Sequence, residues 1–247
     1  MSTQKPTIVL VHGAFAESAS WNGVITRLQN HGVATVAVAN PLRSLTGDAA
    51  YVRDVIASIG TPVVLVGHSY GGMVITEAAA DNEAVVGLVY VSAFAPDTGE
   101  SAFALSTSAP GSTLGDALSA YPVTTGGNEF AIRPDAFHQQ FAADVAEDVA
   151  ALMAATQRPV TEAALSEGLP AARPAWKSIP SWHVFGDQDR NIPVAVFRAG
   201  ADRAGARGTR EIEGASHAAV VSHPDIVAEV IASAGKAYVA SQEALVA

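Results

Sequence analysis

Short apolar runs alternate with helix-forming stretches along most of this 247-residue chain. The apolar runs are rich in β-branched residues and lie at 7–11, 33–38, 62–66, 85–91, 181–185 and 209–212. The helix-forming stretches between and after them occupy 20–30, 47–59, 70–81, 193–204 and 224–234. This alternation predicts a mostly parallel sheet of about six strands, joined by right-handed helical crossovers. Runs such as 8–11 and 63–66 are apolar at every position, as expected of strands that helices cover on both faces.

The alternation stops between Pro96 and Pro180. This segment is rich in Ala, Ser, Gly and Pro, and then in Ala, Asp and Glu over 134–156. We interpret it as a mainly helical cap, inserted at about 97–178 into a single domain that spans 1–247. The residues from Gly235 onward are expected to form a loosely attached helical tail.

Composition narrows the class of protein and its partners. Hydrophobic residues make up 49% of the chain and charged residues 15%, which is typical of a globular protein. The net charge of −10 disfavours binding to nucleic acid or to an anionic membrane. The chain contains no cysteine, which leaves its compartment undetermined, but its N-terminus lacks the pattern of a signal peptide and no apolar run approaches the ~18 residues of a membrane span. We therefore expect a cytoplasmic monomer or homodimer that acts on a small molecule, with no membrane or nucleic-acid partner.

A Gly-x-Ser-x-Gly pattern stands between the apolar run at 63–66 and the next predicted helix. It reads Gly67-His68-Ser69-Tyr70-Gly71. The five residues alone are weakly specific, but a serine at a tight strand-to-helix turn is the setting of a hydrolase nucleophile. Glycines on both sides leave room at such a turn, and the N-terminal end of the following helix favours developing negative charge. Ser69 is therefore predicted to be a nucleophile.

Four segments resemble the α/β-hydrolase superfamily, particularly its small bacterial esterase-like members and the plant methylesterase and hydroxynitrile lyase group. They are 9–15 (Val-Leu-Val-His-Gly-Ala-Phe), 63–72, 186–189 (Gly-Asp-Gln-Asp) with Pro193, and 214–217 (Gly-Ala-Ser-His), in the family's order. The resemblance implies the α/β-hydrolase fold. It also implies an oxyanion hole formed by the backbone N–H groups of Ala14 and Tyr70.

A serine nucleophile needs a base, and neutral histidine is the usual one near pH 7. His217 is preferred because it lies in a small-residue loop after the last predicted strand, at the end of the sheet where ligands bind. The other histidines are expected to support loops or to pack, namely His12, His68, His31, His138, His183 and His223.

The acid that orients this histidine should lie in the loop after the preceding strand. Asp189 is preferred, because Gly186, Asp189 and Pro193 match the family's Gly-x-x-Asp followed by proline. Asp187 is interpreted as a turn residue, and Asp97, just after the run at 85–91, is the reserve candidate.

These residues predict a serine hydrolase that cleaves a carboxylic ester of a small or medium uncharged substrate through an acyl-enzyme. No cofactor and no metal are expected, since the chain lacks cysteine and any His-Glu-x-x-His motif. Four aromatic residues are expected to line an apolar pocket beneath the cap: Phe15, Trp21, Phe94 and Trp176. Phe130, Phe137 and Phe141 are further candidates for this lining.

Several alternatives stay open. Epoxide hydrolases and haloalkane dehalogenases carry aspartate where this chain has Ser69, and plant hydroxynitrile lyases carry lysine where it has Ala218. The first two classes are therefore disfavoured, and a lyase is less expected. Lyase-like, acyltransferase or perhydrolase activity on the same triad remains an alternative, as does a non-catalytic ligand-binding protein on this scaffold.

Overall fold

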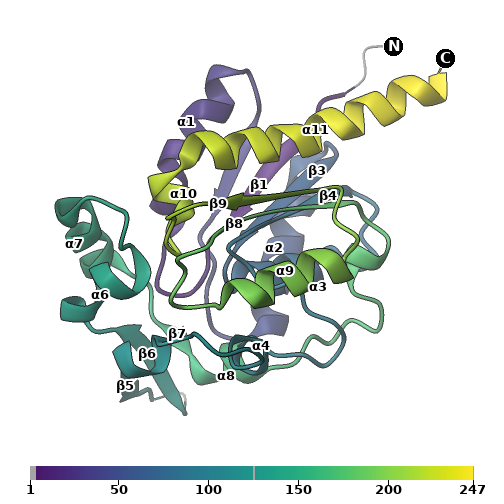
Figure 1. Ribbon diagram of the computed structural model, residues 1–247. Helices are drawn as coiled ribbons and strands as arrows, with labels where there is room; N and C mark the ends of the chain where they lie inside the picture. The colour runs from purple at the N-terminus through teal and green to yellow at the C-terminus, as the bar shows by residue number, and fades with distance from the viewer. Residues whose placement is uncertain (1–3, 125, 247) are drawn as a thin grey trace.

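The computed structural model describes residues 4–124 and 126–246. Within them, a six-stranded sheet runs in the order β2-β1-β3-β4-β8-β9 (Figure 1). Each neighbouring pair of strands is parallel. The strands are β1 (Thr7–Val11), β2 (Thr35–Val38), β3 (Val63–His68), β4 (Val85–Val91), β8 (Ser181–Gly186) and β9 (Gly208–Ile212). The predicted parallel sheet is confirmed, with strand ends displaced by a residue or two.

Helices cover both faces of the sheet because the strands are apolar on both sides. On β1, Ile8 and Leu10 face one core and Val9 and Val11 face the other. The first core lies under α1 (Asn22–Asn30), α10 (Ala219–Ser222) and α11 (Pro224–Val246). The second lies under α2 (Leu45–Ile59), α3 (Gly71–Ala78) and α9 (Val194–Arg203), as Figure 1 shows. Burial of each such aliphatic side chain stabilises the fold by about 1.5–3 kcal/mol.

The helix ends follow local sequence signals. The hydroxyl of Ser44 accepts a hydrogen bond from the Gly47 N–H and caps the start of α2, whereas Gly60, with φ of +67°, ends that helix. The helix expected at 20–30 is divided into a 3-10 turn, η1 (Ser18–Trp21), and α1.

The segment between β4 and β8 holds both helices and strands. Its helices are α4 (Ala102–Ser106), α5 (Leu114–Ala117), α6 (Pro134–Phe141), α7 (Glu147–Thr156), α8 (Glu162–Ser166) and the 3-10 turn η2 (Ala175–Lys177). Antiparallel strands β5 (Leu118–Pro122), β6 (Asn128–Ile132) and β7 (Val160–Thr161) form a second, small sheet. The segment contains helices, as expected of the predicted cap. The small antiparallel sheet was not predicted.

The described residues from Gly235 onward form the helical tail that we expected, and the tail is exposed near its end, where Leu245 is 80% exposed. Helix α11 runs without a break from Pro224 to Val246, and Gly235 lies inside it. A Cβ built on Gly235 would lie 3.7 Å from Cγ of Pro6, so this part of the helix packs beside the start of the chain. No helix among the described residues is both long and apolar enough to cross a membrane.

Candidate active site

Ser69 lies at the sharp turn between β3 and α3, with φ of +55°. This left-handed conformation is uncommon for a residue other than glycine. The turn can close because its neighbours are glycines. A Cβ on Gly67 would lie 2.5 Å from the Gly71 carbonyl oxygen, and a Cβ on Gly71 would lie 2.4 Å from that of Val11. The Ser69 N–H donates to the Val91 carbonyl at 3.2 Å, which fixes the serine at the carboxyl end of the sheet.

The turn after β1 packs directly against this serine. A Cβ on Gly13 would lie 2.6 Å from Cβ of Ser69 and 2.7 Å from the carbonyl oxygen of His68, so only glycine permits the approach. Ala14 and Tyr70 line the same cavity as Ser69. Neither of their backbone N–H groups donates a hydrogen bond within the described part of the chain. Both donors are therefore available to a ligand oxygen bound beside Ser69.

His217 and Asp189 form a buried pair. Nδ1 of His217 donates to Oδ2 of Asp189 at 2.6 Å, and the two side chains are 1% and 0% exposed. The other carboxylate oxygen accepts the N–H groups of Asn191 at 2.8 Å and Ile192 at 2.9 Å. Because Nδ1 carries the proton that bonds the carboxylate, Nε2 keeps its lone pair, which is the tautomer a general base needs.

The loops that carry this pair are held against each other. Oδ1 of Asp187 accepts the Gly214 N–H at 2.7 Å, and the Gln188 N–H donates to the Ala215 carbonyl at 3.0 Å. A Cβ on Gly186 would lie 2.1 Å from that same carbonyl oxygen. Asp187 therefore joins two loops, in agreement with its interpretation as a turn residue.

The reserve candidate, Asp97, is engaged elsewhere. Its Oδ1 binds Nζ of Lys177 at 2.6 Å and accepts the Thr98 N–H at 2.8 Å. The hydrogen bond from Lys177 is the main reason that the pKa of Asp97 lies below its ordinary value. Of the candidate acids, Asp189 is the one hydrogen-bonded to His217 among the described residues.

The loop of His217 reaches the serine turn through His68, the residue before Ser69. Nε2 of His68 donates to the His217 carbonyl at 3.0 Å, and the two imidazole rings are 4.8 Å apart. No hydrogen bond joins Oγ of Ser69 to His217 in the part of the chain described here. In ligand-free enzymes such bonds are often long, and they tighten when substrate binds.

Three other histidines are buried. His12 bonds the Gly13 carbonyl at 2.9 Å, and burial lowers the pKa of His12 to about 4. Burial also lowers the pKa of His68 well below its usual range. His183 stacks on Tyr90 at 4.7 Å, and burial lowers the pKa of His183 to about 3. All three are therefore neutral at pH 7 and pack within the fold.

The remaining histidines have surroundings of their own. His31 is exposed at the end of α1, His138 donates to the Val145 carbonyl at 2.8 Å, and His223 lies 3.2 Å from a carboxylate oxygen of Asp144.

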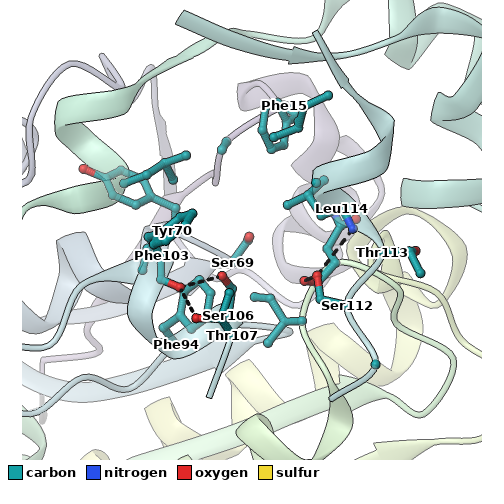
Figure 2. A pocket seen from close by; sticks show the side chains of 18 of the residues that line it. Phe15, Ser69, Tyr70, Phe94, Phe103, Ser106, Thr107, Ser112, Thr113 and Leu114 are labelled. Atoms are coloured by element: carbon teal, nitrogen blue, oxygen red, sulfur yellow. Dashed lines mark hydrogen bonds between the residues drawn. The ribbon is translucent and has the colours of Figure 1, made fainter. Parts of the chain in front are cut away.

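A cavity of about 490 Å³ opens at Ser69. Its floor comes from turns at the end of the sheet, which contribute Phe15 and Phe94 as expected, and its walls come largely from 102–118. Figure 2 shows Phe15, Ser69 and Ser112 around the same space. Among the described residues, the lining has no lysine, arginine or histidine, and Asp116 is its one carboxylate.

Trp21 and Trp176 do not line this cavity, so both expectations were wrong. Trp21 is fully buried in the core beneath α1 and α11. Nε1 of Trp176 donates to the Pro96 carbonyl at 2.7 Å, and Lys177 and Arg203 lie over its ring. Both indoles are packed in the hydrophobic cores, and a buried aromatic ring more often packs in a core than lines a ligand pocket.

The three further aromatic candidates are also packing residues. Phe137 and Phe141 belong to the second core, and the partly buried Phe130 packs against it. Phe141 also packs edge-on against the imidazole of His217, with 4.9 Å between the rings.

The sequence did not predict Asn191 and Ile192, whose N–H groups bind the carboxylate of Asp189. Asp189 accepts the N–H groups two and three residues ahead of it, and this local turn could have been inferred from an aspartate in a polar loop. No cluster of three or more metal-binding side chains occurs among the described residues.

The sequence profile of the alpha/beta hydrolase family matches residues 8–230, and this chain belongs to that family. The alpha/beta hydrolase nvfD of Aspergillus novofumigatus is 30% identical over 262 residues, covering 93% of this chain and 96% of that protein. The carbendazim hydrolyzing esterase of a Nocardioides species is 37% identical over 114 residues, which are 39% of this chain and 46% of that protein.

Solved structures share the fold. Polyneuridine aldehyde esterase superposes with a TM-score of 0.79 at 23% identity, over 93% of this chain and 99% of that one. The methylesterase protein MES16 from Arabidopsis superposes with a TM-score of 0.77 at 17% identity, over 93% of this chain and 98% of that one. The predicted α/β-hydrolase fold is thus confirmed.

Proposed function

We propose that this protein is a serine-dependent hydrolase of carboxylic esters. The observation that carries the proposal is the buried 2.6 Å hydrogen bond between His217 and Asp189, formed by loops that pack against the strained turn of Ser69. Three similar proteins that are named as esterases support this reaction class. The substrates in their names are not assigned to this chain.

The proposed reaction begins when Nε2 of His217 takes the proton of the Ser69 hydroxyl as its oxygen attacks the ester carbonyl. The carbonyl oxygen becomes an oxyanion, which the N–H groups of Ala14 and Tyr70 stabilise. When the C–O bond to the alcohol breaks, His217 returns its proton to the departing alkoxide. Water, deprotonated by the same imidazole, then attacks the acyl-enzyme; the bond between the acyl carbon and Oγ of Ser69 breaks, His217 returns the proton to that oxygen, and the acid is released.

The cavity favours uncharged substrates of small or medium size. Its volume of about 490 Å³ lies within the usual range of small-molecule sites. No cationic side chain among the described lining residues would pair with a carboxylate or phosphate on the substrate. Hydroxyl groups of Ser106, Thr107 and Ser112 supply polar contacts within an otherwise largely apolar surface.

The experiment combines labelling by a fluorophosphonate with hydrolysis of neutral acyl esters of graded chain length. We expect one equivalent of label on Ser69 and measurable ester cleavage, and we expect Ser69→Ala to lose both. Ser92→Ala is the matched control. Ser92 is also a buried serine with positive φ just after a strand, yet it lies outside the cavity lining.

Labelling and cleavage should survive in Ser92→Ala. Folded wild-type protein that takes up no label and cleaves no ester of the panel would overturn the proposal, and it would favour the non-catalytic ligand-binding alternative.

A further inference from the structure

The amide of Gln140 connects the cap to the loop that carries Asp189. Gln140 lies on α6 and is 7% exposed. Its Nε2 donates to the Arg190 carbonyl and to Oδ1 of Asn191, both at 2.9 Å. Its Oε1 accepts the hydroxyl of Thr113 at 2.9 Å. A backbone carbonyl can only accept, so the amide orientation is fixed by its partners.

The same loop receives two more hydrogen bonds from the cap. The hydroxyl of Ser112 donates to the Asn191 carbonyl at 2.9 Å, and the Thr113 N–H donates to the Arg190 carbonyl at 3.0 Å. Both Ser112 and Thr113 also line the cavity at Ser69. The cavity wall and the acid loop therefore share one hydrogen-bonded network.

This network ends at the carboxylate of Asp189. Gln140 binds the side chain of Asn191. The backbone N–H of Asn191 in turn donates to Oδ1 of Asp189 at 2.8 Å. If Asn191 rotates or shifts, that N–H moves away from the carboxylate, and the 2.6 Å bond to His217 moves with it. Buried polar networks of this kind fix a single geometry only while every member is satisfied.

We propose that Gln140 is a positioning residue for the acid of the triad: it holds Arg190 and Asn191 so that Asp189 stays aligned with His217. The inference rests on the proposed hydrolase function for its kinetic consequence. Gln140 touches neither Ser69 nor His217 by any hydrogen bond within the described chain, so it acts through the loop.

The test compares Gln140→Met with Gln139→Met. Methionine is unbranched like glutamine and lacks both amide functions. Gln139 precedes Gln140 on the same helix, but its side chain is exposed and it contributes only its backbone carbonyl, which accepts from Arg190. A general effect of methionine on α6 would appear in both variants, whereas loss of the network would appear in one.

The first readout is spectroscopic. A short imidazole-to-carboxylate hydrogen bond gives a far-downfield proton resonance, which is assigned here by its loss in His217→Ala. We expect this resonance to shift or broaden in Gln140→Met and to be unchanged in Gln139→Met. The second readout is kinetic, on the best ester of the panel: kcat should fall about 10- to 100-fold in Gln140→Met, the size expected of a displacement near 1 Å, while KM changes little.

The outcomes separate the two proposals. If wild-type protein is active and Gln140→Met matches Gln139→Met in both resonance and kcat, the positioning role is wrong, even if the variant melts at a lower temperature. If wild type is inactive, the hydrolase proposal fails, but the resonance still tests the alignment of Asp189 in the resting protein. If Gln140→Met does not fold, Thr113→Val decides, because it removes one partner of the same amide; an unchanged resonance there overturns the inference.

Discussion

Gly13→Ala tests the contact between the turn after β1 and the serine turn. The new Cβ would meet Cβ of Ser69 at 2.6 Å and the His68 carbonyl oxygen at 2.7 Å, whereas ordinary contacts lie at 3.4–4 Å. The two turns must therefore separate by most of an ångström. Ala14 is the next residue, so its N–H moves away from the proposed oxyanion position by a comparable distance.

The expected loss follows from the value of one oxyanion donor. Removing such a donor raises the barrier by about 2.7–4 kcal/mol, which lowers kcat by about 10²- to 10³-fold. The crowding itself should lower the free energy of unfolding by about 1–3 kcal/mol. Steady-state hydrolysis of the best neutral ester measures the first effect, and urea unfolding measures the second.

Gly235→Ala is the control for a glycine-to-alanine change elsewhere. Its Cβ would lie 3.7 Å from Cγ of Pro6, inside α11, so it fits without strain. It should keep full activity and gain roughly 0.5–1 kcal/mol of stability. If folded Gly13→Ala turns over within about threefold of wild type, the packing of this turn does not position an oxyanion donor, and the reasoning from the glycine contact fails.

Three further predictions follow from buried contacts. Asp189→Asn should lower kcat by about 10⁴-fold, because an amide N–H facing Nδ1 favours the wrong imidazole tautomer. His183→Phe should remove part of the acid sensitivity: burial lowers the pKa of His183 from 6.5 to about 3, so the folded state excludes a proton that the unfolded state binds. Stability is therefore lost as pH falls from 6.5 towards 3, by about 1.4 kcal/mol per pH unit for this group, while phenylalanine keeps the stacking on Tyr90. Tyr70→Phe should lower the free energy of unfolding by about 1–3 kcal/mol, since it removes the 2.9 Å hydrogen bond to the buried carboxylate of Asp48.

Each of these predictions has a direct measurement. Hydrolysis rates test Asp189→Asn, and activity close to wild type would contradict the role of the carboxylate. Urea unfolding at pH 7, 5.5 and 4 tests His183→Phe, and an unchanged slope against pH would show that another group takes up the proton. Urea unfolding at pH 7 tests Tyr70→Phe, and no loss of stability would mean that Asp48 finds another donor.

The sheet could be predicted from the sequence because its strands carry the strongest local signal. Strand β3 is apolar over 63–66 and fully buried on both faces, so its pattern predicts a central strand of a sheet covered on both sides. The serine turn could be predicted for a similar reason. Gly67 must be glycine because its Cβ would meet the backbone of Gly71, only four residues away, and Gly71 must be glycine because its Cβ would meet the backbone of β1.

The cap could not be predicted to the same depth. Strand β5 has four exposed positions out of five residues, so it buries too little to show an alternating pattern. Its hairpin signal is the pair Gly126 and Gly127, both with positive φ. Two further features depend on tertiary structure and have no signal in the local sequence. They are the core in which Trp21 packs and the hydrogen bond from Gln140 to a loop 50 residues away.

The cavity divides its two tasks between different stretches of chain. In the proposed hydrolase, backbone turns at the sheet end would fix where a substrate is attacked, whereas short helices and hydroxyl-bearing loops at 102–118 would decide which molecules fit. Most replacements in that wall could thus redirect selectivity while leaving activation of the nucleophile intact. Ser112 and Thr113 are the exception, because they also brace the acid loop, so a new preference acquired there would come together with a change in turnover.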